Sequence, residues 1–121
     1  RIVVSRTRPP GEAVAVAEAI GAQLLPMGSA GAKAMAVVQG VADIYIHSGG
    51  QYEWDNCAPV AVAEAAGLHV SRLDGAPLRY NNQNPYLPDP LVYNQRNVYL
   101  PDLLICRKEL ASRIMGLLAR T

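Results

Sequence analysis

Residues that can bind or activate a small molecule recur just after strand-like segments of this sequence. They carry hydroxyl, ammonium, guanidinium, imidazole and carboxylate groups, and they are Ser5, Arg8, Ser29, Lys33, His47 and Asp55. Ligands of layered α/β proteins bind outside the carboxyl ends of the strands. The placement alone therefore predicts that these six side chains share one edge of a sheet.

The stretch from Met27 to Lys33 has the features of an anion-binding turn. Ser29 is a good N-cap for a helix expected from about Ala30 to Gln39. The N-terminus of a helix offers free N–H groups and the positive end of the helix dipole to a phosphate. Lys33 adds a full charge at the same end, although a lysine in a first turn is often only a solvated surface residue.

An acidic residue, Asp55, lies where an alanine-rich helix begins, in the string Glu53-Trp54-Asp55-Asn56-Cys57-Ala58-Pro59. By itself an Asp at this place usually caps the helix. The string W-D-x-x-A-P, followed by a small-residue helix that closes at Gly67, resembles the lithium-sensitive, magnesium-dependent phosphomonoesterases. That family includes inositol monophosphatases, fructose bisphosphatases and bisphosphate nucleotidases. The resemblance covers essentially all 121 residues and implies that Asp55 is a Mg²⁺ ligand, since Mg²⁺ prefers oxygen donors.

Two further motifs resemble the CysQ-type 3'(2'),5'-bisphosphate nucleotidases within this family. The turn 27–33 is similar to their G-[SGA]-x-G-x-K motif, and Ser5 and Arg6 match the start of their S-R-S-H motif. Arg8 replaces the family histidine, but a guanidinium can still bind a phosphate bidentately. The resemblance implies a bisphosphate nucleotide as substrate, bound by residues after the strands: Ser5, Arg8, Ser29, Lys33 and His47. The alternative for residues 5–8 is a solvated basic loop.

The other metal ligands of the family lie in a Glu-Glu pair and an Asp-Pro-[ILV]-Asp-Gly-[TS] motif, and neither string occurs in this sequence. We therefore expect residues 1–121 to be a single domain, the C-terminal, substrate-binding half of a longer phosphatase that is inactive without its N-terminal half. Three other acids do not replace the missing set. Asp43 opens a strand, Asp74 precedes Gly75 in a turn, and Glu53 is expected to point away from Asp55.

The expected activity is hydrolysis of the 3'-phosphate of 3'-phosphoadenosine 5'-phosphate to AMP, with Mg²⁺ as the cofactor. Two alternatives stay open. One is inositol monophosphatase or fructose-1,6-bisphosphatase activity on the same fold, against which Lys33 argues because a cation there suits a second phosphate. The other is a nucleotide-binding module without catalysis, which the missing carboxylates permit.

Strand-like and helix-like segments alternate along the chain. Helical periodicity is clearest from Glu12 to Ile20, which ends at Gly21, and in the apolar stripe that includes Leu110 and Ile114. Alternation of this kind predicts an α/β layered domain with a mixed, largely parallel sheet flanked by helices. Strands are expected near residues 1–5, 23–27, 42–47, 68–72 and 102–106, and helices near 11–21, 29–39, 55–66 and 107–119.

Composition excludes several classes of protein. Half of the residues are hydrophobic, 17% are charged and the net charge is +1, which excludes a disordered tail and a polybasic protein that binds nucleic acid polymers. No apolar run approaches the roughly 20 residues that span a bilayer. Cys57 and Cys106 are expected to be reduced core residues. We therefore expect a cytoplasmic protein whose partner is a small phosphorylated substrate, with a homodimer possible.

The segment 78–90 is echoed by the segment 91–103, each with a Tyr-Asn stretch before Leu-Pro-Asp. Two copies are too few for a repeat architecture, which needs about three or more units. We interpret the pair as a local duplication that forms an extended loop. It is expected to be solvated, and the alternative is that it covers a neighbouring chain or the substrate.

Overall fold

The computed structural model describes residues 1–78 and 99–120, and within them the side chains of all residues except 49–56 and 99–101. Most of the duplicated segment 78–103 lies outside this range, so its role stays a prediction.

The described residues form strands and helices in the predicted order. The strand β3 continues to Tyr52 instead of ending near residue 47, and the helix α3 begins at Glu53 instead of residue 55. All the other elements lie within a few residues of their expected places. In chain order they are β1 (Ile2–Ser5), α1 (Gly11–Ile20), β2 (Leu24–Met27), α2 (Ala30–Val38), β3 (Ile44–Tyr52), α3 (Glu53–Ala65), β4 (His69–Ser71), β5 (Tyr99–Cys106) and α4 (Lys108–Leu118).

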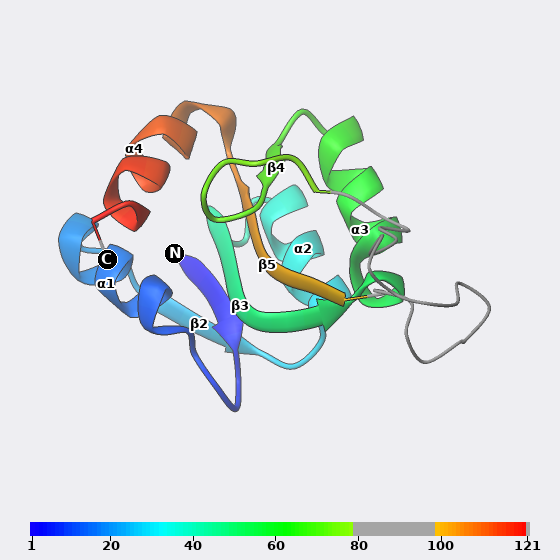
Figure 1. Ribbon diagram of the computed structural model, residues 1–121, viewed down its shortest axis with the longest axis horizontal. Helices are drawn as coiled ribbons and strands as arrows, with labels where there is room; N and C mark the ends of the chain where they lie inside the picture. Colours follow the sequence, from blue (N-terminus) through cyan, green and yellow to red (C-terminus); the bar gives the residue numbers. More distant parts are fainter. Residues whose placement is uncertain (79–98, 121) are drawn as a thin grey trace, which may run out of the picture.

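The strands form a single five-stranded sheet in the order β2-β1-β3-β5-β4 (Figure 1). β1 pairs in parallel with both β2 and β3, whereas β5 runs antiparallel to β3 and to β4. The predicted mixed, largely parallel sheet is therefore confirmed. The chain leaves β1 for β2 on one side and later returns to β3 on the other side, so the strand order reverses between β1 and β3. Ligands of such sheets bind at this reversal, outside the carboxyl ends of the strands.

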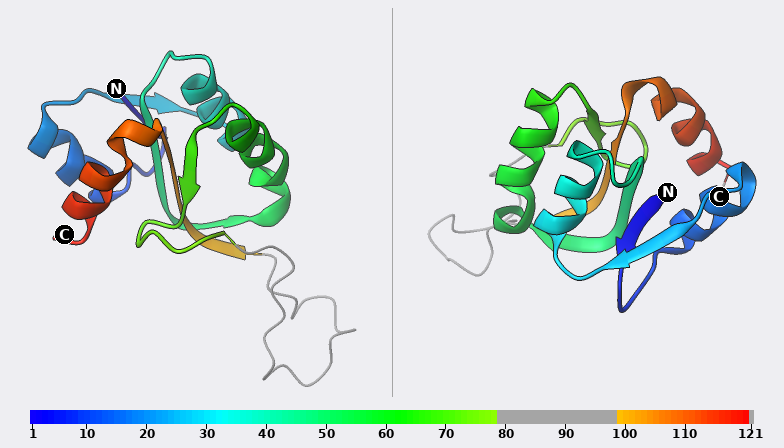
Figure 2. Two further views of the ribbon diagram at one scale, coloured as in Figure 1. Left: turned by 90° about the horizontal axis from the view of Figure 1, so that it is seen from above. Right: turned by 180° about the vertical axis from the view of Figure 1, so that it is seen from behind.

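Two pairs of helices cover the two faces of the sheet (Figures 1 and 2). The pair α1 and α4 packs on the face that carries Ile44 and Ile46 of β3. The pair α2 and α3 packs on the opposite face, which carries Tyr45. Successive residues of a strand point to opposite faces, so β3 contributes to both cores.

The apolar periodicity of the sequence accounts for both cores. On the first face Val16 of α1 and Ile114 of α4 are fully buried, and on the second face Val37 of α2 and Val60 of α3 are at most 3% exposed. No helix in the described part of the chain is long and apolar enough to cross a bilayer.

The two cysteines differ, and the prediction for one of them is wrong. Cys106 is buried in β5, and this burial raises the pKa of its thiol to about 12. Cys57 is exposed on α3, because the apolar side of that helix is formed by residues such as Val60 and Ala63. Both thiols are free.

Candidate functional site

The carboxyl ends of β1 and β2 lie side by side at the edge where the sequence predicts the site. Ser5 pairs with Met27 in the parallel register, and the backbone N–H of Arg6 donates to the carbonyl of Met27 at 3.2 Å. In the register between β1 and β3, Val3 lies opposite Tyr45. Ser5 and His47, two residues further along each strand, therefore extend toward the same edge.

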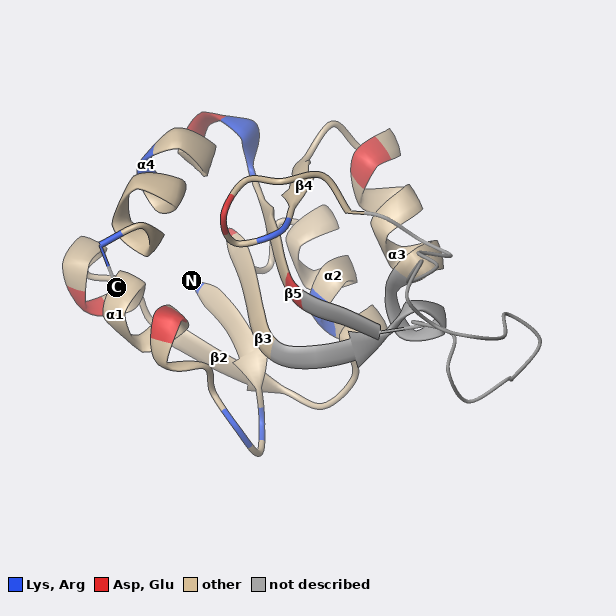
Figure 3. Cartoon of the chain, in the orientation of Figure 1, with Lys and Arg blue, Asp and Glu red and all other residues tan. Residues whose placement is uncertain are grey.

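The β1–α1 loop carries basic residues at this edge (Figure 3). The Oγ of Ser5 accepts a hydrogen bond from the backbone N–H of Arg8 at 3.3 Å and lies 3.4 Å from the Oγ1 of Thr7. Ser5 therefore helps to fold the loop, and the Arg8 side chain is exposed. Among the described side chains none forms an ion pair with Arg8, so its guanidinium is available to an anion.

The Met27–Lys33 turn has the predicted geometry. Ser29 is the N-cap of α2, and its Oγ accepts the backbone N–H of Ala32 at 2.9 Å. A hydroxyl that accepts this bond still has its own O–H to donate. Arg6 approaches the same turn, since its Cζ lies 3.9 Å from the position of a Cβ on Gly28. Arg6 is thus a basic group near the turn that the sequence analysis did not include among the site residues.

Lys33 does not lie on the solvated surface, so that alternative is wrong. Its side chain is only 3% exposed, and its Nζ is 5.4 Å from the centroid of the Tyr45 ring. Burial lowers the pKa of Lys33, because removal from water disfavours the charged ammonium. In the described part of the chain no carboxylate forms an ion pair with this ammonium.

His47 lies inside β3 and not beyond its end, because the strand continues to Tyr52. Its ring is half-buried and meets the Tyr45 ring edge-on, with the centroids 6.4 Å apart and the planes at 60°. The structure thus groups Lys33, Tyr45 and His47 on one face of the sheet. Tyr45 was not among the predicted site residues, although the two-residue period of a strand places residues 45 and 47 on the same face.

Asp55 is the third residue of α3, directly after β3. The helix begins earlier than expected, so Asp55 lies within the first turn and is not its N-cap. Pro59 has no N–H, so it cannot form the helical hydrogen bond to the carbonyl of Asp55 four residues earlier. Its Cγ lies 3.7 Å from the position of a Cβ on Gly31, so the beginning of α2 contacts the middle of α3.

The Asp55 side chain is outside the described set, and its metal role stays a prediction. No group of three or more His, Cys, Asp or Glu side chains that could hold a metal ion occurs among the described residues. Asp43 precedes β3 at the opposite edge of the sheet, where one oxygen lies 3.0 Å from the Nη2 of Arg107. The described residues therefore do not make a complete Mg²⁺ site.

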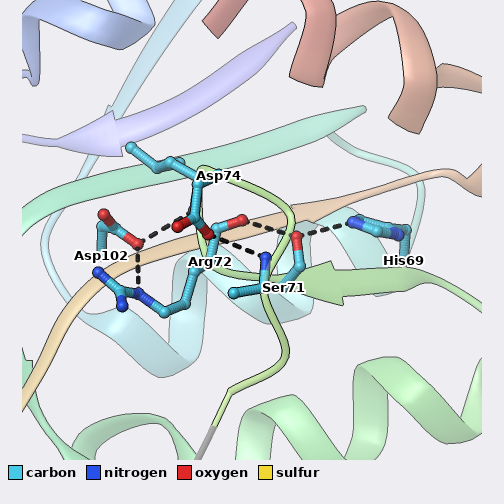
Figure 4. A network of polar contacts seen from close by, with 7 residues as sticks. His69, Ser71, Arg72, Asp74 and Asp102 are labelled. Atoms are coloured by element: carbon cyan, nitrogen blue, oxygen red, sulfur yellow. Dashed lines mark hydrogen bonds and ion pairs between the residues drawn. The ribbon is translucent and has the colours of Figure 1, made fainter. Parts of the chain in front are cut away.

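A separate polar network joins β4, β5 and the turn after β4 (Figure 4). The Oδ1 of Asp102 accepts the backbone N–H of Leu73 at 3.0 Å and the Nε of Arg72 at 3.3 Å. Asp74 accepts the backbone N–H of Ala76 at 2.9 Å, which confirms the predicted turn at Asp74 and Gly75. Each of these two carboxylates accepts a hydrogen bond from a nearby backbone N–H group and so stabilises the turn after β4.

A cavity of about 290 Å³ adjoins this network on the side of α1 and α4. None of the six predicted site residues lines it, and it opens on the face of the sheet opposite α2 and α3. It is therefore distinct from the predicted site. Its walls are formed by Glu12, Leu73, Asp74, Asp102, Met115, Leu118 and Ala119.

Comparison with known proteins agrees with this architecture. Residues 3–118 match the model of the inositol monophosphatase family. A 3'-phosphoadenosine 5'-phosphate phosphatase of Mycobacterium bovis is 50% identical over 119 residues, which are 98% of this chain and 40% of that protein. The chain thus spans about two fifths of the length of this relative.

Solved structures share the fold. CysQ from Bacteroides thetaiotaomicron superposes with a TM-score of 0.61 at 26% identity, over 88% of this chain and 36% of that chain. An IMPase/NADP phosphatase, solved in complex with Mg²⁺ and phosphate, superposes with a TM-score of 0.63 at 17% identity. That similarity covers 96% of this chain and 38% of the other, and at such low identity it concerns the fold alone.

Proposed function

This chain belongs to the inositol monophosphatase family, and from that premise we propose that it is the C-terminal, substrate-binding half of a Mg²⁺-dependent phosphomonoesterase. The proposed reaction is hydrolysis of the 3'-phosphate of 3'-phosphoadenosine 5'-phosphate, which gives AMP and phosphate. The identity of 50% to a mycobacterial phosphatase of that name supports this choice over other activities of the family.

The observation that carries the proposal is the burial of Lys33. Burying an ammonium is costly unless an anion pairs with it, and none of the described carboxylates does so. Lys33 is in the first turns of α2, whose N-terminal N–H groups also favour an anion. A substrate phosphate bound at this helix would supply a negative charge to pair with the ammonium.

The chain's own residues would bind and orient the substrate. Ser29 would donate its O–H to one phosphate, with the positive charge of Lys33 close behind it. Arg8, on the loop that Ser5 folds, would bind the other phosphate. His47 would form a hydrogen bond with the part of the nucleotide between the two phosphates. It could donate or accept this bond, since a neutral imidazole has one nitrogen for each role.

Mg²⁺ would, when bound, polarise the phosphate and activate the attacking water. Asp55 would contribute one carboxylate to it from the first turn of α3. The remaining ligands are proposed to come from the half of the enzyme that corresponds to the other part of the longer relatives.

Substrate comparison in the full-length protein tests this function. With Mg²⁺ present, phosphate release from 3'-phosphoadenosine 5'-phosphate should exceed release from inositol 1-phosphate and fructose 1,6-bisphosphate. Lys33→Ala should raise the KM for the nucleotide by about 10- to 150-fold, the value of a charge-assisted contact. Lys108→Ala, which removes an exposed lysine at the start of α4, should leave KM unchanged.

Two results would contradict the proposal. Faster hydrolysis of inositol or fructose phosphate would identify a different activity on the same fold. Tight binding of the nucleotide without turnover, with Mg²⁺ saturating, would instead indicate a binding module.

A further inference from the structure

We propose that Tyr45 is a positioning residue, whose ring holds the Lys33 ammonium and the His47 imidazole in fixed places at the substrate-binding edge. The inference rests on the function proposed above, because it assigns Tyr45 a role in substrate binding through two other residues.

The geometry of the three side chains carries the inference. The Tyr45 ring is fully buried, with the Lys33 Nζ 5.4 Å from its centroid and the His47 ring 6.4 Å away in an edge-on arrangement. Lys33 reaches the ring from α2, whereas His47 stands two residues further along the same strand. The ring is therefore in contact range of two groups from different elements.

The chemistry of an aromatic ring suits this position. Its negative face attracts a cation within about 6 Å, and the attraction is stronger when water is excluded. Its positive edge favours T-shaped contacts with a second ring. An aliphatic side chain of similar size would fill the same space but would provide neither interaction.

Packing fixes the ring itself. Tyr45 belongs to the core cluster that includes Ala34 and Val37 of α2 and Val60 and Ala63 of α3. The two helices that pack on this face thus limit the movement of the ring, and the ring in turn limits where the Lys33 ammonium can lie. A flexible lysine chain that is held in this way loses less freedom when a phosphate binds.

Three variants of the full-length protein test the role. Tyr45→Leu removes the ring, Tyr45→Phe keeps it, and Ile46→Ala is the matched control because Ile46 is equally buried in β3 but faces α1 and α4. Thermal unfolding of each variant measures the structural cost. The KM and kcat for 3'-phosphoadenosine 5'-phosphate and a titration of the Lys33 Cε resonance by NMR then report on positioning.

Tyr45→Leu should raise KM by about 2- to 30-fold, the range of a cation–π contact converted to affinity, with a smaller change in kcat. It should also lower the pKa of Lys33 further, because the charged form loses its aromatic partner. Tyr45→Phe should keep the KM within about twofold of the wild-type value and should leave the pKa of Lys33 unchanged, since a phenyl ring also binds cations. Ile46→Ala should lower the melting temperature without moving either value.

The inference is overturned if Tyr45→Leu leaves the Lys33 titration unchanged, or if Ile46→Ala raises KM as much as Tyr45→Leu does. Failure of the proposed function gives a different result. The wild-type protein would then not hydrolyse the nucleotide, while the Lys33 titration in the same variants would still decide whether Tyr45 positions the ammonium.

Discussion

Pro59 of α3 lies against Gly31 of α2, with its Cγ 3.7 Å from the point where a Cβ on Gly31 would stand. A separation of 3.7 Å is ordinary van der Waals contact, so a single methyl group fits between the two helices. The contact matters for the site because α2 carries Ser29 and Lys33 near its beginning, and α3 carries Asp55.

Substitution of Gly31 should therefore separate two effects. Gly31→Ala should stabilise the protein by no more than about 0.5–1 kcal/mol, because that is the advantage of alanine over glycine in a helix interior and Gly31 is only the second residue of α2. Gly31→Val should destabilise it by about 1–3 kcal/mol through overpacking against Pro59, and it should raise KM because α2 and α3 are pushed apart. Urea unfolding and substrate titration measure the two effects. An equal free energy of unfolding for both variants would contradict the prediction, because it would mean that α2 and α3 accommodate the larger side chain without loss of stability.

The metal role of Asp55 can be tested by Asp55→Asn in the full-length protein. We expect turnover to fall by about 100-fold and the Mg²⁺ requirement to rise, as for the loss of a ligand at a catalytic metal. Stability should fall by only about 0.3–1 kcal/mol, because a first-turn Asp is lost from the favourable end of the helix dipole.

Turnover at limiting Mg²⁺ and thermal unfolding should be measured on the same Asp55→Asn sample. Wild-type turnover would exclude Asp55 from the metal site, and a large loss of stability would assign it a structural role instead.

The sequence predicted the order of the elements because that order depends on local patterns. Glu12 to Ile20 has helical periodicity and closes at Gly21, which adopts a left-handed conformation with φ of 68°. The N-cap at Ser29 was likewise predictable, since it depends on residues within one turn.

Burial of Lys33 and the contact with Tyr45 could not be predicted in the same way. They depend on how α2 crosses β3, a tertiary arrangement that no pattern within α2 specifies. The early start of α3 at Glu53 has a similar cause. β3 continues to Tyr52 by pairing with β5, which lies far away in sequence, and the helix follows directly.

The lowered pKa of Lys33 predicts how substrate affinity depends on pH. Burial disfavours the ammonium, so Lys33 should lose its proton at a lower pH than an exposed lysine. The KM for the nucleotide should therefore rise with pH through this lowered pKa, and Lys33→Arg should remove that rise because arginine stays protonated. A KM that is constant until the ordinary range of lysine would contradict the burial of the charge.

The same shift has a consequence for stability. Between the folded and the ordinary pKa, the unfolded chain binds more protons at Lys33 than the folded chain does, so stability should increase with pH in that interval. At neutral pH the buried charge lowers stability, and Lys33→Met should raise the free energy of unfolding while it weakens nucleotide binding. Urea unfolding at pH 7 measures the first effect. A less stable Lys33→Met protein would mean that the ammonium has a strong partner in the folded state.

Arg8, which is exposed on the loop just beyond β1, carries the last prediction. We expect its exposed guanidinium to bind a substrate phosphate. Arg8→Glu should therefore weaken nucleotide binding by about 10- to 150-fold, the value of the lost charge-assisted contact. Arg8→His should retain substantial activity. Arg113→Glu, the same charge change at an exposed site on α4, should leave binding unchanged and so controls for net charge.

Ionic strength distinguishes a phosphate contact of Arg8 from a neutral contact to the nucleotide. Salt screens exposed charge pairs, with a Debye length of about 10 Å at 0.1 M, so affinity should fall more steeply with salt in the wild-type protein than in Arg8→His. Nucleotide titration at two salt concentrations, in both proteins, measures the difference. Parallel salt dependence would show that Arg8 is a solvated loop residue and that Ser5 folds the loop for another purpose.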